Sequence, residues 1–91
     1  MSAEAIDIGY GVSIQITAYA DGTEAGIIET HPHRQTGKPC SGAVLWNRRD
    51  TILKSPTWRL ISREPLTLEP SILCRECGNH GFIREGRWVP A

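Results

Sequence analysis

The chain has 91 residues, with ten Lys or Arg residues, ten Asp or Glu residues and a formal net charge of zero. This length corresponds to a single domain, 1–91, and the balanced charge lacks the basic excess of a dedicated nucleic-acid-binding protein. No apolar run approaches the ~20 residues that a membrane span needs, and Met1-Ser2-Ala3-Glu4 lacks the basic and apolar regions of a secretory signal. Three cysteines, an odd number, also argue against a secreted disulfide framework, so we expect a cytoplasmic protein without a membrane partner.

The N-terminal third has the pattern of a β-hairpin. Apolar and polar residues alternate from 12 to 17, which places one set on a single face of a strand: Val12, Ile14 and Ile16. Asp21-Gly22 favours a tight turn because these residues readily adopt positive φ angles. Residues 24–30 then read as the return strand, which predicts a hairpin within residues 1–30.

The middle of the chain is predicted to be a loop followed by short strands. Residues 31–42 contain two prolines and two glycines without hydrophobic periodicity, which is typical of a loop. Residues 43–46 and 58–63 each read as a short strand, and the polar segment 47–56 reads as an irregular excursion between them.

Prolines and a second turn signal shape the C-terminal third. Pro65 and Pro70 exclude a helix interior or a central strand between them, which favours an extended edge segment with Leu66 and Leu68 pointing inward. Residues 81–84 and 87–89 flank Glu85-Gly86, a two-residue connection that predicts a C-terminal hairpin. No segment has a helical period of useful length.

Cys74 and Cys77 form the sharpest local motif, Cys74-Arg75-Glu76-Cys77-Gly78. Two cysteines separated by two residues can close a turn in which both sulfur atoms face one point, and Gly78 permits the left-handed backbone that ends such a turn. Zn²⁺ requires four ligands in a tetrahedron, so two more must come from elsewhere in the chain.

Two ligand sets complete the site. In the first, Cys40, Cys74, Cys77 and His80 bind the metal. In the second, His31 and Cys40 face Cys74 and Cys77. His33 is the weakest candidate, since it lies beyond a proline on the more polar side. Either set makes zinc part of folding, because a chain this short has a marginal apolar core.

Other chemistry of the cysteine pair is disfavoured. A redox Cys-x-x-Cys of the thioredoxin type opens a helix, whereas glycines and a predicted hairpin follow Cys77 here. The motifs of zinc deaminases, zinc proteases and phosphate-binding loops are absent, so we expect no enzyme. The large aromatic residues are expected to fill the small core and shield the metal: Trp46, Trp58, Phe82 and Trp88.

The segment 58–91 resembles the ending of a family of short uncharacterised proteins encoded in bacteriophages and prophages. The residues that carry the resemblance are Pro70-Ser71, the run from Cys74 to His80, and Phe82-Ile83. They are also similar to a broader bacterial domain of unknown function, some members of which are encoded beside ubiquitin-like conjugation genes. The pair retained in that broader set corresponds to Cys77 and His80, so the resemblance favours His80 over His31 as the fourth ligand.

The resemblance covers residues 31–46 only loosely and residues 1–30 not at all. The chain departs from the broader set at the first ligand cluster, where Cys40 stands alone. The resemblance implies zinc and a phage origin, and it implies no activity.

Together these features predict a mainly β, small zinc-ribbon-like domain with N-terminal and C-terminal β-hairpins, in which residues 31–91 bind Zn²⁺. The expected function is that of a phage or prophage accessory protein in the host cytoplasm, which binds a host or phage protein. The alternative is a nucleic-acid-binding zinc ribbon. It rests on residues 47–91, which contain eight basic and five acidic residues with interleaved tryptophans.

Overall fold

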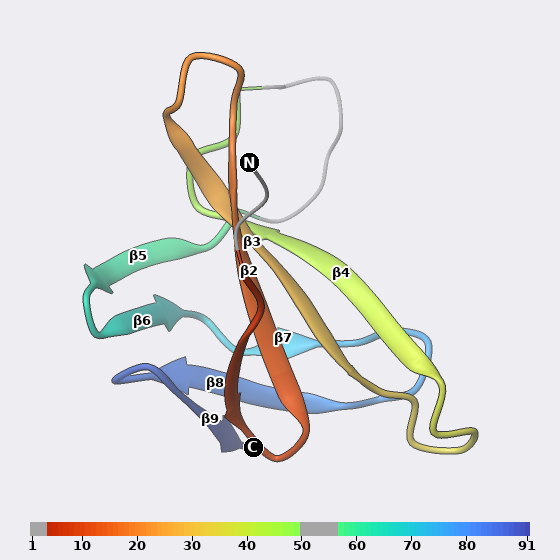
Figure 1. Cartoon of the computed structure of the whole chain (residues 1–91). Helices are drawn as coiled ribbons and strands as arrows, with labels where there is room; N and C mark the ends of the chain where they lie inside the picture. Colours follow the sequence, from red (N-terminus) through yellow and green to blue (C-terminus); the bar gives the residue numbers. More distant parts are fainter. Residues whose placement is uncertain (1–3, 50–56) are drawn as a thin grey trace.

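The computed structural model describes residues 4–49 and 57–91, which form nine strands in three antiparallel sheets (Figure 1). No helix occurs in these residues, so none of them forms a membrane-spanning helix. The first sheet has the order β1-β2-β3-β4, with β1 (Ile6–Gly9), β2 (Val12–Ala18), β3 (Glu24–Pro32) and β4 (Pro39–Leu45). The second pairs β5 (Arg59–Arg63) with β6 (Leu66–Glu69). The third has the order β7-β8-β9, with β7 (Ile72–Leu73), β8 (His80–Arg84) and β9 (Arg87–Pro90).

The mainly β prediction is confirmed, and both hairpins are present. β2 pairs with β3 in antiparallel register across the Asp21-Gly22 turn, where the Asp21 carboxylate accepts a hydrogen bond from the Thr23 N–H. β8 pairs with β9 across Glu85-Gly86, whose φ angles of 52° and 75° are both positive. Two successive positive φ angles match the twist of the flanking strands and close the hairpin tightly.

The predicted loop over residues 31–42 is too long. β3 continues to Pro32 and β4 begins at Pro39, so only the turn between them is irregular. The register pairs His31 with Cys40 and Pro32 with Pro39, at the end of the sheet. Strand pairing extends into this segment although its residues alternate poorly, because the partner strand supplies the hydrogen bonds. Most of the predicted excursion 47–56 lies outside the described residues.

The C-terminal strands cover one face of the first sheet. In Figure 1, β7 and β8 run past β3 and β4 toward the β3–β4 turn. Leu66 and Leu68 are buried as predicted, and β6 lies against β8. The core is one cluster drawn from all three sheets: Ile8, Val12, Ile14, Ile27, Val44, Leu66, Leu68, Ile72, Ile83 and Trp88. Trp46 and Trp58 pack against this cluster and Phe82 is half-buried, so only Trp88 of the four large aromatic residues is fully within the core.

Gly81 tests how tightly this core is packed. A Cβ atom at Gly81 would lie 2.5 Å from two ring carbons of the buried Trp88. We therefore expect Gly81→Ala to lower the free energy of unfolding by about 1–3 kcal/mol, the usual cost of overpacking. Urea denaturation measures this loss. Gly42→Ala is the matched control, because a Cβ there meets no atom within 4 Å, and an equal loss in both variants would contradict the packing argument.

Candidate metal centre and the adjacent serine–histidine pair

Four potential metal ligands converge where β3 and β4 meet the turn between β7 and β8. They are His31, Cys40, Cys74 and Cys77, and one ligand atom from each lies within 4.8 Å of all the others. His31 and Cys40 face each other across the β3–β4 register, while Cys74 follows β7 and Cys77 lies in the turn. The structure therefore brings together the second of the two ligand sets that the sequence allowed.

Backbone hydrogen bonds hold the two cysteines of the turn. The Gly78 N–H donates to the Cys74 carbonyl at 2.8 Å, and the Cys74 N–H donates to the Asn79 carbonyl at 2.8 Å. Gly78 has a φ of +80°, a left-handed conformation that a Cβ would strain. The sequence motif thus forms the turn expected of it, with both sulfur atoms on one side.

The donor set fits a four-coordinate metal ion. Tetrahedral ligands at about 2.3 Å from a metal lie about 3.8 Å from one another. The His31 Nε2 and Cys77 Sγ atoms are 3.3 Å apart, and the remaining ligand atoms fall within the 4.8 Å limit. All three cysteines are free, and three of the four ligand residues are buried. These residues can hold a metal ion with four protein ligands and no position left for a substrate.

The thiol groups differ in their affinity for protons. Burial alone would raise the pKa of Cys77, but the backbone N–H groups of Arg34 and Asn79 and the His31 ring lower it to about 6. For Cys40, burial and the negative charge of Cys74 and Cys77 raise the pKa to about 11. Crowding several thiols thus disfavours ionising all of them together. A bound cation removes this penalty by neutralising the thiolates.

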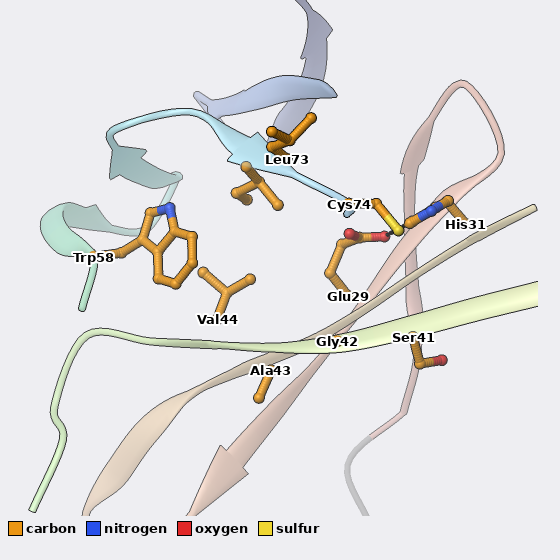
Figure 2. Close-up of a pocket in the computed structure, with 10 residues that line it drawn as sticks. Glu29, His31, Ser41, Gly42, Ala43, Val44, Trp58, Leu73 and Cys74 are labelled. Atoms are coloured by element: carbon orange, nitrogen blue, oxygen red, sulfur yellow. Dashed lines mark hydrogen bonds and ion pairs between the residues drawn. The ribbon is translucent and has the colours of Figure 1, made fainter. Parts of the chain in front are cut away.

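Glu29 is a buried partner of the cluster that sequence reasoning missed. Its carboxylate Oε2 lies 2.5 Å from His31 Nδ1, and only 3% of the Glu29 residue is exposed (Figure 2). Burial raises the pKa of Glu29, and the hydrogen bond from His31 partly offsets that rise. By accepting a hydrogen bond from Nδ1–H, the carboxylate leaves Nε2 to face the cysteines, as in the carboxylate–histidine pairs behind many metal sites. The signal was present in the sequence, since residues 29 and 31 share one face of a strand.

The two other histidines lie outside the cluster. His33 is in the β3–β4 turn, where its Nδ1 accepts the Gln35 N–H at 3.1 Å. His80, the fourth ligand favoured by the resemblance, is the first residue of β8 and is exposed. Its Nε2 lies 2.8 Å from Ser71 Oγ. The β7–β8 register decides this placement: Gly81 opposite Ile72 is buried, so its neighbour His80 points to the opposite face of the sheet.

The Ser71–His80 pair is held by the same turn as the metal ligands. Ser71 immediately precedes β7 and His80 begins β8, so the turn containing Cys74 and Cys77 connects them. The Ser71 carbonyl accepts the Trp58 indole N–H at 3.3 Å, and the His80 carbonyl accepts the Ala91 N–H at 3.1 Å. A histidine nitrogen at this distance can take the proton of a serine hydroxyl and so activate it as a nucleophile. Within residues 4–49 and 57–91, no third side chain is hydrogen-bonded to the His80 ring.

Metal content distinguishes the two ligand sets. We expect one equivalent of divalent metal in the wild-type protein and its loss in Cys40→Ala and His31→Ala, because each removes a ligand from the cluster. The melting temperature should fall with the metal, since binding contributes directly to folding. Elemental analysis and thermal unfolding measure both effects. His80→Ala should retain metal and stability, and its loss of metal would contradict this ligand assignment.

Glu29 should tune the affinity of the centre. We expect Glu29→Gln to weaken metal binding by about 10–100-fold, the range found when such supporting partners are altered. Competition with a chromogenic chelator measures this change. Glu24→Gln is the control, because Glu24 is an acidic residue of the same strand whose half-exposed carboxylate pairs with Arg63 instead. Equal affinities in both variants would show that Glu29 does not orient His31.

The comparisons with known proteins give one family. The profile of the family described as bacterial ubiquitination-like system serine protease (BubE) matches residues 39–91. The matched segment contains Ser71, His80 and the three cysteines, whereas Glu29 and His31 precede it. Neither the search of curated proteins nor that of solved structures gives a significant match. The match also agrees with the resemblance to a bacterial domain encoded near ubiquitin-like systems. Because the profile covers more than half of the 91 residues, the chain belongs to the BubE family.

Proposed function

We propose that this protein is a serine hydrolase that cleaves peptide bonds, with Ser71 as the nucleophile and His80 as the general base. The observation that carries the proposal is the 2.8 Å separation of Ser71 Oγ and His80 Nε2. The family description, which names a serine protease, supports it. We extend to this chain the setting named there, a bacterial ubiquitination-like system.

The chemistry begins with the Ser71 hydroxyl. Its oxygen attacks the carbonyl carbon of the substrate while His80 Nε2 accepts the hydroxyl proton, which forms a tetrahedral intermediate and an imidazolium. The imidazolium then gives this proton to the leaving amine as the C–N bond breaks, and an acyl-Ser71 ester remains. A water molecule, deprotonated by His80, hydrolyses the ester and restores both side chains. Two residues supply every proton transfer in this cycle.

The surroundings of the Ser71–His80 pair support its proposed role in hydrolysis. His80 is exposed and Ser71 is half-buried, so a substrate can approach both side chains. The His80 ring stacks on Phe82 with centroids 6.5 Å apart, which limits its rotation. The Trp58 indole fixes the Ser71 backbone through the Ser71 carbonyl. The general requirement of a fixed nucleophile–base distance is thereby met without a third catalytic side chain.

We further propose that the metal is Zn²⁺ and that its role is structural. A set of three thiolates and one imidazole is typical of structural zinc sites, in which four protein ligands close the coordination sphere. Zinc in this position ties the turn between Ser71 and His80 to β3 and β4, in the manner of a zinc-ribbon-like domain. The ion supplies rigidity, and the proton transfers belong to Ser71 and His80.

This proposal departs from the expectation that the chain is not an enzyme. That expectation compared the sequence with local catalytic motifs, whereas Ser71 and His80 meet through the pairing of β7 with β8. The phage origin, the role as a protein-interaction module and the nucleic-acid-binding alternative remain predictions. No contact of the described residues favours them as specifically as the Ser71–His80 hydrogen bond favours hydrolysis.

A serine-directed fluorophosphonate probe tests the proposal. The wild-type protein should form one covalent adduct at Ser71, and Ser71→Ala should form none. Replacing His80 by Gln should slow both labelling and peptide hydrolysis by about 10²–10⁴-fold, the contribution of a positioned general base. Mass spectrometry locates the adduct, and the double variant should be no slower than the worse single one.

Ser41→Ala provides the matched control for this experiment. Ser41 is an exposed serine whose hydroxyl is bonded to Thr30 and not to a histidine. It should label and hydrolyse like the wild type. Retained hydrolysis in Ser71→Ala protein of normal metal content would rule out the proposed nucleophile.

A further inference from the structure

A cavity of about 100 Å³ lies between β4 and β7 (Figure 2). Its apolar wall is formed by Val44, Trp58, Ile72 and Leu73, and its other end reaches Glu29 and His31. In Figure 2 the Trp58 ring lies on one side of the cavity and the β7 strand on the other. Mainly apolar hollows with a few polar groups at one end are typical of binding sites for small molecules or side chains.

Gly42 creates this space. Side chains alternate along β4, so Gly42 belongs to the same face as Cys40 and Val44, both of which are buried. Gly42 lines the cavity and is itself exposed, so the cavity is open to solvent at this position. A Cβ atom at Gly42 would meet nothing within 4 Å. Figure 2 shows the neighbouring Ala43 and Ser41 directed to the other side of the strand.

Two connections join the wall of the cavity to the backbone of the proposed nucleophile. Ile72, which forms part of the wall, is the next residue after Ser71. Trp58, at one end of the wall, donates its indole N–H to the Ser71 carbonyl at 3.3 Å. Leu73 lies opposite His80 in the strand register and is 56% exposed, so the wall also reaches the face that carries the histidine.

The edges of β4 and β7 can bind the backbone of a peptide whose side chain enters the cavity. β4 is the last strand of its sheet and β7 the last of its own, so each has one edge without a partner strand among the described residues. An extended peptide beside these edges can form main-chain hydrogen bonds and place alternate side chains toward the cavity. Other segments of the substrate remain outside.

We infer that the cavity left by Gly42 is the pocket for an aliphatic side chain of the peptide substrate, on the residue whose carbonyl Ser71 attacks. The inference rests on the proposed hydrolase function and adds the substrate preference. A volume of about 100 Å³ suits a side chain of a few carbon atoms, whereas an aromatic ring or a long charged side chain does not fit. The apolar wall favours burial of methyl groups, and Glu29, engaged with His31, disfavours an added negative charge.

Selectivity among matched substrates tests the pocket. Peptide esters that differ only in the residue at the attacked carbonyl, glycine, leucine or phenylalanine, are hydrolysed by wild-type protein and by Gly42→Val. We expect the wild type to prefer leucine over glycine by at least about tenfold in kcat/KM, since even one methylene in an apolar pocket contributes that much. Gly42→Val should abolish this preference, so that the leucine and glycine esters are hydrolysed with similar kcat/KM.

Ala43→Val is the matched control, because Ala43 also borders the cavity but its side chain is directed to the other side of β4 (Figure 2). It should keep the leucine preference. An unchanged preference in Gly42→Val, or an equal loss in Ala43→Val, would overturn the pocket assignment. Metal content measured for both variants shows whether the neighbouring ligands have been disturbed.

A binding experiment separates failure of the pocket from failure of the proposed reaction. In the Ser71→Ala protein, N-acetyl-leucinamide should shift the NMR signals of the Ile72 and Val44 methyl groups, and N-acetyl-glycinamide should not. Gly42→Val in the same background should remove the shift. Methyl shifts without any Ser71-dependent hydrolysis would retain the pocket and reject the hydrolase. Ser71-dependent hydrolysis without these shifts would reject the pocket alone.

Discussion

The convergence of His31, Cys40, Cys74 and Cys77 is the constraint on which the rest of the molecule depends. The apolar core of this short chain contains ten buried residues in the described part, and a domain of this size has little stability to spare. The cluster joins the end of the β3–β4 pair to the β7–β8 turn, two regions more than thirty residues apart in the chain. With a metal bound, this junction fixes the relative position of the first and third sheets at the edge of the apolar core.

The geometry of the Ser71–His80 pair depends on that junction. The two residues flank a short turn whose conformation depends on the hydrogen bonds of Cys74, Gly78 and Asn79. A flexible connection would allow Ser71 and His80 to separate, because β7 contains only two residues and pairs with β8 at only two positions. Rigid ligands at both ends of the Cys-x-x-Cys segment replace the support that a longer strand would give. In the proposed function, a structural metal would serve catalysis indirectly, by holding Ser71 and His80 at hydrogen-bond distance.

The absence of a side chain at Gly42 has a related consequence. Along the buried face of β4, a ligand at position 40 and a core residue at position 44 are separated by a position without a Cβ. The same strand therefore contributes to the metal cluster, to the cavity and to the core, at successive positions of one face. The cavity lies between this strand and β7, and Trp58 of its wall donates a hydrogen bond to the Ser71 carbonyl.

Local patterns in the sequence determined the hairpins, the inward-facing Leu66 and Leu68 and the Cys74–Cys77 turn, because alternation, turn chemistry and short ligand spacing act over a few residues. Only the tertiary structure places His31, and not His80, beside the three cysteines. The register of β3 with β4 places His31 beside Cys40, and the register of β7 with β8 directs His80 to Ser71 on the opposite face. The same reason explains why Glu29, Ser71 and the Gly42 cavity escaped notice. Each becomes significant only through a neighbour from a different strand, and a one-residue shift in strand pairing would reverse the face to which every one of these side chains points.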